Sequence, residues 1–129
     1  MNSDQVLDEF RDAEALLEGH FILSSGLHSR TYLQCARVLM DTRRAARLAE
    51  ALAKKIKAAT DSRIDAVVAP AMGGLIIGHE VARALDVDSM FLERVDGTFT
   101  LRRGFHLDDT PNVVMIEDIV TTGLSSHEA

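Results

Sequence analysis

The sequence contains a single cysteine, Cys35, among its 129 residues. An internal disulfide is therefore excluded and a cysteine-rich metal site is not expected, so Cys35 is predicted to be a buried, small apolar residue at a strand end. No apolar run approaches the ~20 residues that a membrane-spanning helix needs. The amino terminus, Met-Asn-Ser-Asp-Gln, has no signal-peptide pattern. These absences predict a cytoplasmic protein.

Positive charge is also scarce. The 14 lysines and arginines are outnumbered by 20 aspartates and glutamates, which gives a net charge of -6. This balance argues against a nucleic-acid-binding surface. An anionic ligand would need local hydrogen-bond donors, because the net negative charge of the protein repels it. With 47% apolar residues, the chain is long enough for one domain with its own core.

Hydrophobic periodicity predicts alternating helices and strands. Apolar residues at helical spacing predict a first helix, capped by Ser3, that runs to about Glu18 and is ended by Gly19. Further helices are expected over 42–59, capped by Asp41, and over 75–85. Strands are expected at 20–23, 31–35, 64–69, 89–95 and 113–116, with a turn at 24–29 and a hairpin or mobile arm near 98–101.

The end of the chain leaves the predicted sheet unfinished. A helix is expected to begin after Gly123, but the sequence stops at Ala129. Three parallel strands without a completed final crossover would leave an exposed sheet edge. The sequence is therefore expected to be cut short, or else a partner subunit covers that edge.

The most informative stretch is the apolar strand 113–116 together with the loop after it. The strand is expected to be buried on both faces, and it stops at the adjacent carboxylates of Glu117 and Asp118. Ligands bind at the carboxyl ends of strands in α/β sheets. Thr121-Thr122-Gly123 then combines hydroxyls and a glycine before a helix, which suits a phosphate. The plainer interpretation is an acidic strand end leading into a loop.

A second signal is the loop at 70–74, Pro-Ala-Met-Gly-Gly, which comes after the strand at 64–69. Backbone N–H groups at the start of the next helix would face an anion there. Alternatively, the glycine pair only allows close packing of a helix on a strand.

Together these motifs carry a family resemblance. The acidic pair with Thr-Thr-Gly resembles the phosphoribosyl-diphosphate (PRPP) signature of type I phosphoribosyltransferases, and residues 70–74 resemble their diphosphate loop. Residues 18–29 resemble the N-terminal hood of the orotate phosphoribosyltransferases, and residues 101–105 resemble their mobile catalytic loop. The resemblance implies a parallel, Rossmann-like α/β sheet incomplete at the C-terminus. It also implies a single domain 1–129, with helix and hood in 1–40 and the α/β core in 41–129.

The resemblance further implies transfer of ribose 5-phosphate from PRPP to orotate, with Mg²⁺ held mainly through PRPP, in a homodimer. The implied residues are Asp118, Arg102 and Arg103 for catalysis; Ser25, Tyr32 and Thr121 for orotate; and Gly73, Gly74, Arg94, Glu117, Asp118, Ile119, Val120, Thr121, Thr122, Gly123, Leu124 and Ser125 for PRPP.

The chain departs from the family pattern at two positions. Ser24 and Gly73 stand where many of these enzymes carry a lysine, so Arg94, Arg102 and Arg103 are left to supply positive charge. Three alternatives stay open: a type I transferase with a purine acceptor, a PRPP-binding module without catalysis, and an inactive fragment of an enzyme.

Overall fold

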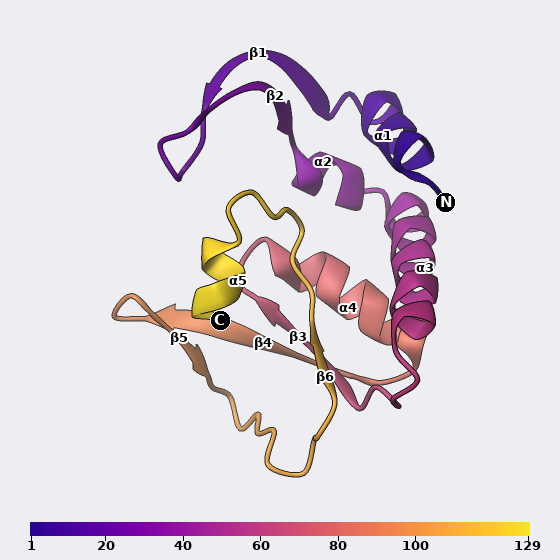
Figure 1. The fold of residues 1–129 in the computed structure, drawn as a ribbon, viewed down its shortest axis with the longest axis vertical. Coiled ribbons are helices and arrows are strands. Elements are labelled where there is room, and N and C mark those ends of the chain that lie inside the picture. Colours follow the sequence, from indigo (N-terminus) through magenta and orange to yellow (C-terminus); the bar gives the residue numbers. More distant parts are fainter. The chain divides into compact units, whose positions relative to one another are not determined.

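The computed structural model describes residues 1–129, which divide into two compact units, Met1–Ala45 and Ala46–Ala129. The first unit contains α1 (Ser3–Asp12), β1 (Leu16–Ile22), β2 (His28–Leu33) and α2 (Cys35–Leu39) (Figure 1). β1 and β2 form a two-stranded antiparallel sheet. The turn between them, expected at 24–29, closes where Leu23 N–H donates to Leu27 O and Gly26 N–H donates to Leu23 O.

The first helix is shorter than predicted. It begins after Asn2, not Ser3, because Asn2 and Gln5 form a reciprocal capping box. It ends at Asp12 rather than near Glu18. Glu14 adopts a left-handed conformation with a φ of 52°, and Ala15 N–H donates to Phe10 O, which closes the helix as a glycine usually would. Gly19 consequently lies within β1.

The prediction for residues 31–35 is also wrong in part. β2 ends at Leu33, and Cys35 begins the short helix α2, which the sequence pattern did not reveal. Burial of Cys35 is confirmed, since its exposed fraction is 5%. With five residues, α2 is too short for its apolar residues to reveal a helical period, so it could not be told apart from the strand before it.

The helix α3 (Thr42–Ala59) begins where it was predicted, because Asp41 Oδ1 accepts hydrogen bonds from the N–H groups of Arg43 and Arg44. The second unit continues with β3 (Ala66–Pro70), α4 (Gly74–Leu85), β4 (Asp88–Val95), β5 (Thr98–Leu101), β6 (Val113–Met115) and α5 (Leu124–Glu128).

The sheet of the second unit has the order β5-β4-β3-β6. β4 and β6 both run parallel to β3, which confirms the predicted parallel core. β5 pairs antiparallel with β4 through a tight turn at Asp96 and Gly97, so the expected hairpin is present. All five residues of β3 are buried, and β3 is therefore the centre of the fold.

β6 is not buried on both faces as predicted. It lies at the sheet edge, and Val113 and Met115 are 36% and 39% exposed. Only Ile116, just past the strand, is buried, at 4% exposure. Apolar composition alone does not distinguish a central strand from an edge strand, because both can carry Val, Ile and Met.

The two faces of β3 are covered differently. α4 packs on one face so closely that a Cβ on Gly78 would lie 2.5 Å from the Ala69 Cβ (Figure 1). Ala66 and Val68 belong to the other cluster, as the alternation of side chains along a strand requires. That cluster also contains Met90, Leu92 and the partly buried Phe99, Leu101, Phe105 and Leu107. Residues of β5 and the arm after it thus complete the core.

We expect Gly78→Ala to destabilise the protein, although alanine favours helix by up to about 1 kcal/mol at an exposed position. The added methyl group would overpack the contact with Ala69, at a cost of roughly 1–3 kcal/mol. Urea unfolding measures the difference. Lys54→Gly and Lys54→Ala, at an exposed site of α3, calibrate helix propensity alone. A Gly78→Ala variant more stable than the parent would contradict the close approach.

Candidate functional site

The two predicted anion-binding motifs meet at one edge of the sheet. A Cβ on Gly73 would lie 2.7 Å from Asp118 Oδ1 and 3.0 Å from Asp118 Oδ2. A Cβ on Gly74 would lie 2.9 Å from the backbone oxygen of Ile116. β3 and β6 are adjacent parallel strands, so the turn after one and the acidic pair after the other share the same edge. At Gly74 an added side chain would meet the backbone of Ile116, whereas at Gly73 it would meet the end of the Asp118 side chain, which would have to shift.

The loop after β6 then leads back into α5 (Figure 1). Gly123 precedes the helix with a φ of 78°, a conformation that glycine adopts without strain. Leu124 N–H donates to Thr122 Oγ1 at 3.3 Å. Thr121, Thr122 and Ser125 are exposed. This is the glycine and hydroxyl arrangement that the sequence predicted, including the start of a helix after Gly123.

Glu117 and Asp118 differ in their surroundings. Burial raises the pKa of the Glu117 carboxyl above its ordinary value, and the neighbouring Asp118 charge raises it further. A hydrogen bond from Ser126 Oγ to Glu117 Oε2, at 3.5 Å, opposes this shift in pKa. Both carboxyls are half-buried and could accept hydrogen bonds from sugar hydroxyls.

The three predicted arginines are not equivalent. The Arg94 guanidinium lies 4.1 Å from the Phe99 ring centroid, donates to Gly97 O at 2.9 Å and pairs with Glu128 at 2.6 Å. Arg103 forms a two-pronged pair with Glu93. Arg102 is exposed. Two of the three cations that were predicted to supply positive charge to the PRPP site are therefore paired with acids in this conformation.

The residues predicted for orotate, Tyr32 and Ser25, belong to the first unit. Tyr32 lies on β2, with its ring centroid 5.6 Å from that of Phe21 on β1. Ser25 lies in the connecting turn, where its Oγ accepts a hydrogen bond from Leu27 N–H at 3.3 Å.

Sequence reasoning missed a pair of histidines in the same hairpin. His20 Nε2 and His28 Nδ1 lie 2.6 Å apart, beside a cavity of about 420 Å³. The β1–β2 register shifts between Glu18 and Phe21, and His20 lies within this irregularity. No spacing rule for histidines predicts such a pair, because the irregular pairing decides which side chains meet.

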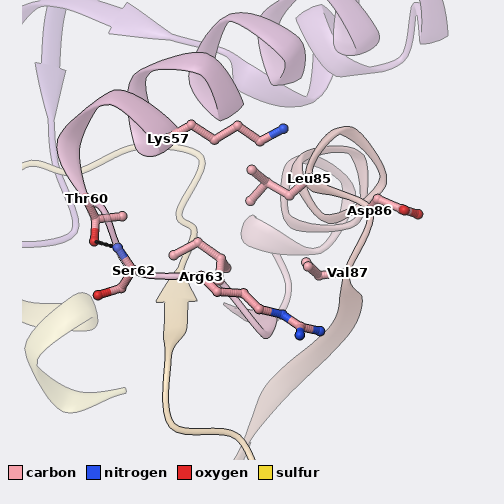
Figure 2. Close-up of a pocket in the computed structure, with 8 residues that line it drawn as sticks. Lys57, Thr60, Ser62, Arg63, Leu85, Asp86 and Val87 are labelled. Carbon is pink, nitrogen blue, oxygen red and sulfur yellow. Dashed lines mark hydrogen bonds between the residues drawn. The ribbon is translucent and has the colours of Figure 1, made fainter.

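A separate cavity, of about 320 Å³, lies at the opposite end of the sheet from Asp118. Figure 2 shows it between the end of α3, which supplies Lys57, and the end of α4, which supplies Leu85. Ile64 and Val87, which line it, lie shortly before β3 and β4. None of the predicted site residues lines this cavity.

No group of three or more histidine, cysteine, aspartate or glutamate side chains is arranged to hold a metal ion. None of the helices has the combined length and apolar character needed to cross a membrane.

No protein-family model matches the chain. Among curated proteins, it is 64% identical over 129 residues to the orotate phosphoribosyltransferase of Erythrobacter litoralis (strain HTCC2594), covering 100% of this chain and 67% of that protein. It is 65% identical to the enzyme of the same name from Rhizorhabdus wittichii, covering 66% of that protein. The crystal structure of orotate phosphoribosyltransferase from Aeropyrum pernix matches 95% of this chain and 68% of that one, with a TM-score of 0.69 at 27% identity.

A parallel sheet whose glycine turn and acidic strand end meet at one edge defines a type I phosphoribosyltransferase core. The chain belongs to the orotate phosphoribosyltransferase family. It spans about two thirds of the length of these two curated relatives. This agrees with the expectation that part of the family's length lies outside this sequence.

The raised pKa of Glu117 predicts a pH-dependent effect on stability. Because its folded-state pKa lies above the unfolded value, the group contributes stability below the unfolded pKa that is lost as pH rises through the folded pKa. Glu117→Gln should therefore raise the urea midpoint at pH 7 more than at pH 4. Glu18→Gln, at an exposed carboxylate of β1, provides the comparison. An equal effect of Glu117→Gln at both pH values would contradict the predicted shift.

Proposed function

We propose that this chain carries the PRPP site of an enzyme that transfers ribose 5-phosphate to orotate, giving orotidine 5′-monophosphate and diphosphate. The observation that carries the proposal is the contact between the Gly73 turn and the Asp118 carboxylate. In the proposal, the Gly73 turn binds the diphosphate and the neighbouring carboxylates accept hydrogen bonds from the ribose hydroxyls. The three relatives described above are orotate phosphoribosyltransferases, which supports the choice of orotate as the acceptor.

In this mechanism the protein holds the sugar and need not supply a nucleophile. Glu117 and Asp118 accept hydrogen bonds from the ribose 2′- and 3′-hydroxyls and lie close to the positive charge that develops on the ring. Backbone N–H groups and hydroxyls of residues 121–125 bind the 5′-phosphate. Holding both ends of the ribosyl group orients its anomeric carbon toward the incoming orotate nitrogen.

A magnesium ion bound with PRPP would supply positive charge to the diphosphate, and Glu117 and Asp118 are the acidic side chains nearest the proposed site. The chain offers the hard oxygen ligands of Asp118 and Glu117 but no cluster of three such groups. This donor set fits an ion that is held mainly by diphosphate and ribose oxygens. The main task of the protein toward that ion is to present the carboxylates at the edge of the sheet.

The remaining parts of the proposal concern orotate, assembly and location. Tyr32, Ser25 and Thr121 would contact orotate, and Arg102 and Arg103 would close over the diphosphate. Residues 102–107 form an arm after β5, which suits contact with a neighbouring subunit in a homodimer. We also propose a cytoplasmic location.

A PRPP-binding module without catalysis is the second candidate. The pairing of Arg103 with Glu93 favours it, because an arm arginine that stays bound to an acid does not reach the leaving diphosphate, whereas residues 121–125 could still hold a 5′-phosphate. Release of diphosphate that requires both orotate and PRPP distinguishes the two. PRPP binding without turnover would favour the binding module.

Asp118→Asn should lower turnover by roughly 100-fold or more, because it removes a charge from beside the developing cation. The circular dichroism spectrum and melting temperature should stay close to those of the parent. Asp108→Asn, at an exposed acid beyond the arm, is the matched control. Undiminished diphosphate release by Asp118→Asn would overturn the ribose role of this residue.

Gly123→Val should abolish PRPP binding, since a β-branched residue is strained at a φ of 78° and would displace the phosphate loop. Isothermal titration with PRPP measures the loss. Gly26→Val tests strain alone, because Gly26 has a φ of 82° in open space, in the turn between β1 and β2. Normal PRPP affinity in Gly123→Val would count against the phosphate site.

A further inference from the structure

We propose that Glu93 is a positioning residue that holds Arg103 when the site is empty and yields it to the departing diphosphate. The inference rests on the proposed function, because it requires Arg103 to meet a diphosphate. It adds a residue to which the sequence assigned no role. It also separates the tasks of the two adjacent arginines of the arm.

The contact itself is well formed. Arg103 Nε donates to Glu93 Oε2 at 2.8 Å, and a terminal guanidinium nitrogen donates to Glu93 Oε1 at 2.9 Å. The Glu93 side chain is 21% exposed, whereas the Arg103 side chain is 60% exposed. The carboxylate is thus the sheltered partner, fixed on β4 opposite Thr100. The guanidinium, on the arm, is the partner that can move.

Aromatic packing places Arg103 within reach of Glu93. The Arg103 guanidinium lies 5.7 Å from the Phe91 ring centroid, and Phe91 makes an edge contact with Phe105 at 5.2 Å. Arg103 and Gly104 have φ values of 62° and 76°, so the chain turns sharply here. The hydrogen bond with Arg103 holds the pKa of the Glu93 carboxyl below its ordinary value, so Glu93 is charged at neutral pH.

The same donors suit a phosphate. The planar guanidinium fork binds carboxylate and phosphate oxygens with the same two-pronged geometry. Glu93 occupies the Nε and Nη2 donors of Arg103 and leaves the Nη1 side open. A diphosphate that binds in the two-pronged manner through Nε and Nη2 must therefore displace Glu93, and the two anions compete for that side of the guanidinium. The apparent diphosphate affinity is reduced by the fraction of molecules in which the pair is closed. Arg102 is exposed, and we assign it the direct contact with the anion.

The resting pair is tested without any ligand. In the 129-residue protein labelled with ¹⁵N-arginine, the Arg103 Nε–H signal is assigned by its loss in Arg103→Gln. The Arg103 Nε–H proton should exchange with solvent several-fold more slowly than the Arg102 Nε–H proton. In Glu93→Gln the two protons should exchange at the same rate. Asp96→Asn removes a charge from the same hairpin and should leave the Arg103 rate unchanged. Equal exchange of Arg102 and Arg103 in the parent would refute the pair.

The exchange step is tested by titrating inorganic diphosphate in the presence of Mg²⁺. Glu93→Gln should tighten binding about two- to five-fold, the range expected for an exposed ion pair. When Arg103→Gln is already present, Glu93→Gln should tighten diphosphate binding no more than Asp96→Asn does. Asp96→Asn measures the general effect of removing one negative charge. Equal tightening in both backgrounds, or weaker binding in Glu93→Gln, would overturn the exchange alone. Absence of diphosphate binding in every variant would overturn the exchange and the proposed function together.

Discussion

The close approach of two backbone segments at the edge of the sheet is the constraint on which the site depends. Gly73 and Gly74 bring the turn after β3 against Asp118 and the Ile116 carbonyl, while Gly78 seats α4 on Ala69. Any side chain at these positions meets an atom closer than ordinary packing allows. The glycines therefore do more than permit a turn. They determine how far the acidic pair stands from the N-terminus of α4.

Little unpaired positive charge lies near the proposed anion site. The chain carries a net charge of -6 and has neither of the lysines that the family resemblance led us to expect at positions 24 and 73. A side chain at position 73 would also have to displace the Asp118 carboxylate. The remaining cations Arg94 and Arg103 are matched to Glu128 and Glu93. In the proposed site, affinity for an anion would therefore come from oriented backbone N–H groups, from the exposed Arg102 and from exchange of ion-pair partners.

The sheltered β4 strand links the core to the arm. Its inward residues Met90 and Leu92 pack in the apolar cluster, while Glu93 and Arg94 come next at the strand end. The arm returns through Phe105 onto Phe91. The exposed ion pair between Arg103 and Glu93 can open at low cost, whereas Phe105 and Leu107 of the arm pack on the core cluster. The fold thus combines a sheet with a packed core and an exposed arginine pair at the end of β4.

Local signals in the sequence predicted much of the second unit. Asp41 marked the start of α3, apolar runs marked the parallel strands, and Gly123 marked the start of α5. The sequence-based predictions failed where an element depended on an unusual backbone conformation or on its place among distant strands. A left-handed Glu14 ended α1 without a glycine, and the position of β6 at the sheet edge left Val113 and Met115 partly exposed.

By itself, therefore, the sequence determined the type of most elements and the chemistry of each motif, because caps, turns and periodicity act over a few residues. Only the tertiary structure decided that the Gly73 turn touches Asp118, that Arg103 pairs with Glu93, and that His20 meets His28. Those pairings depend on strand order and register, which are set by the burial of the whole sheet and not by any one segment.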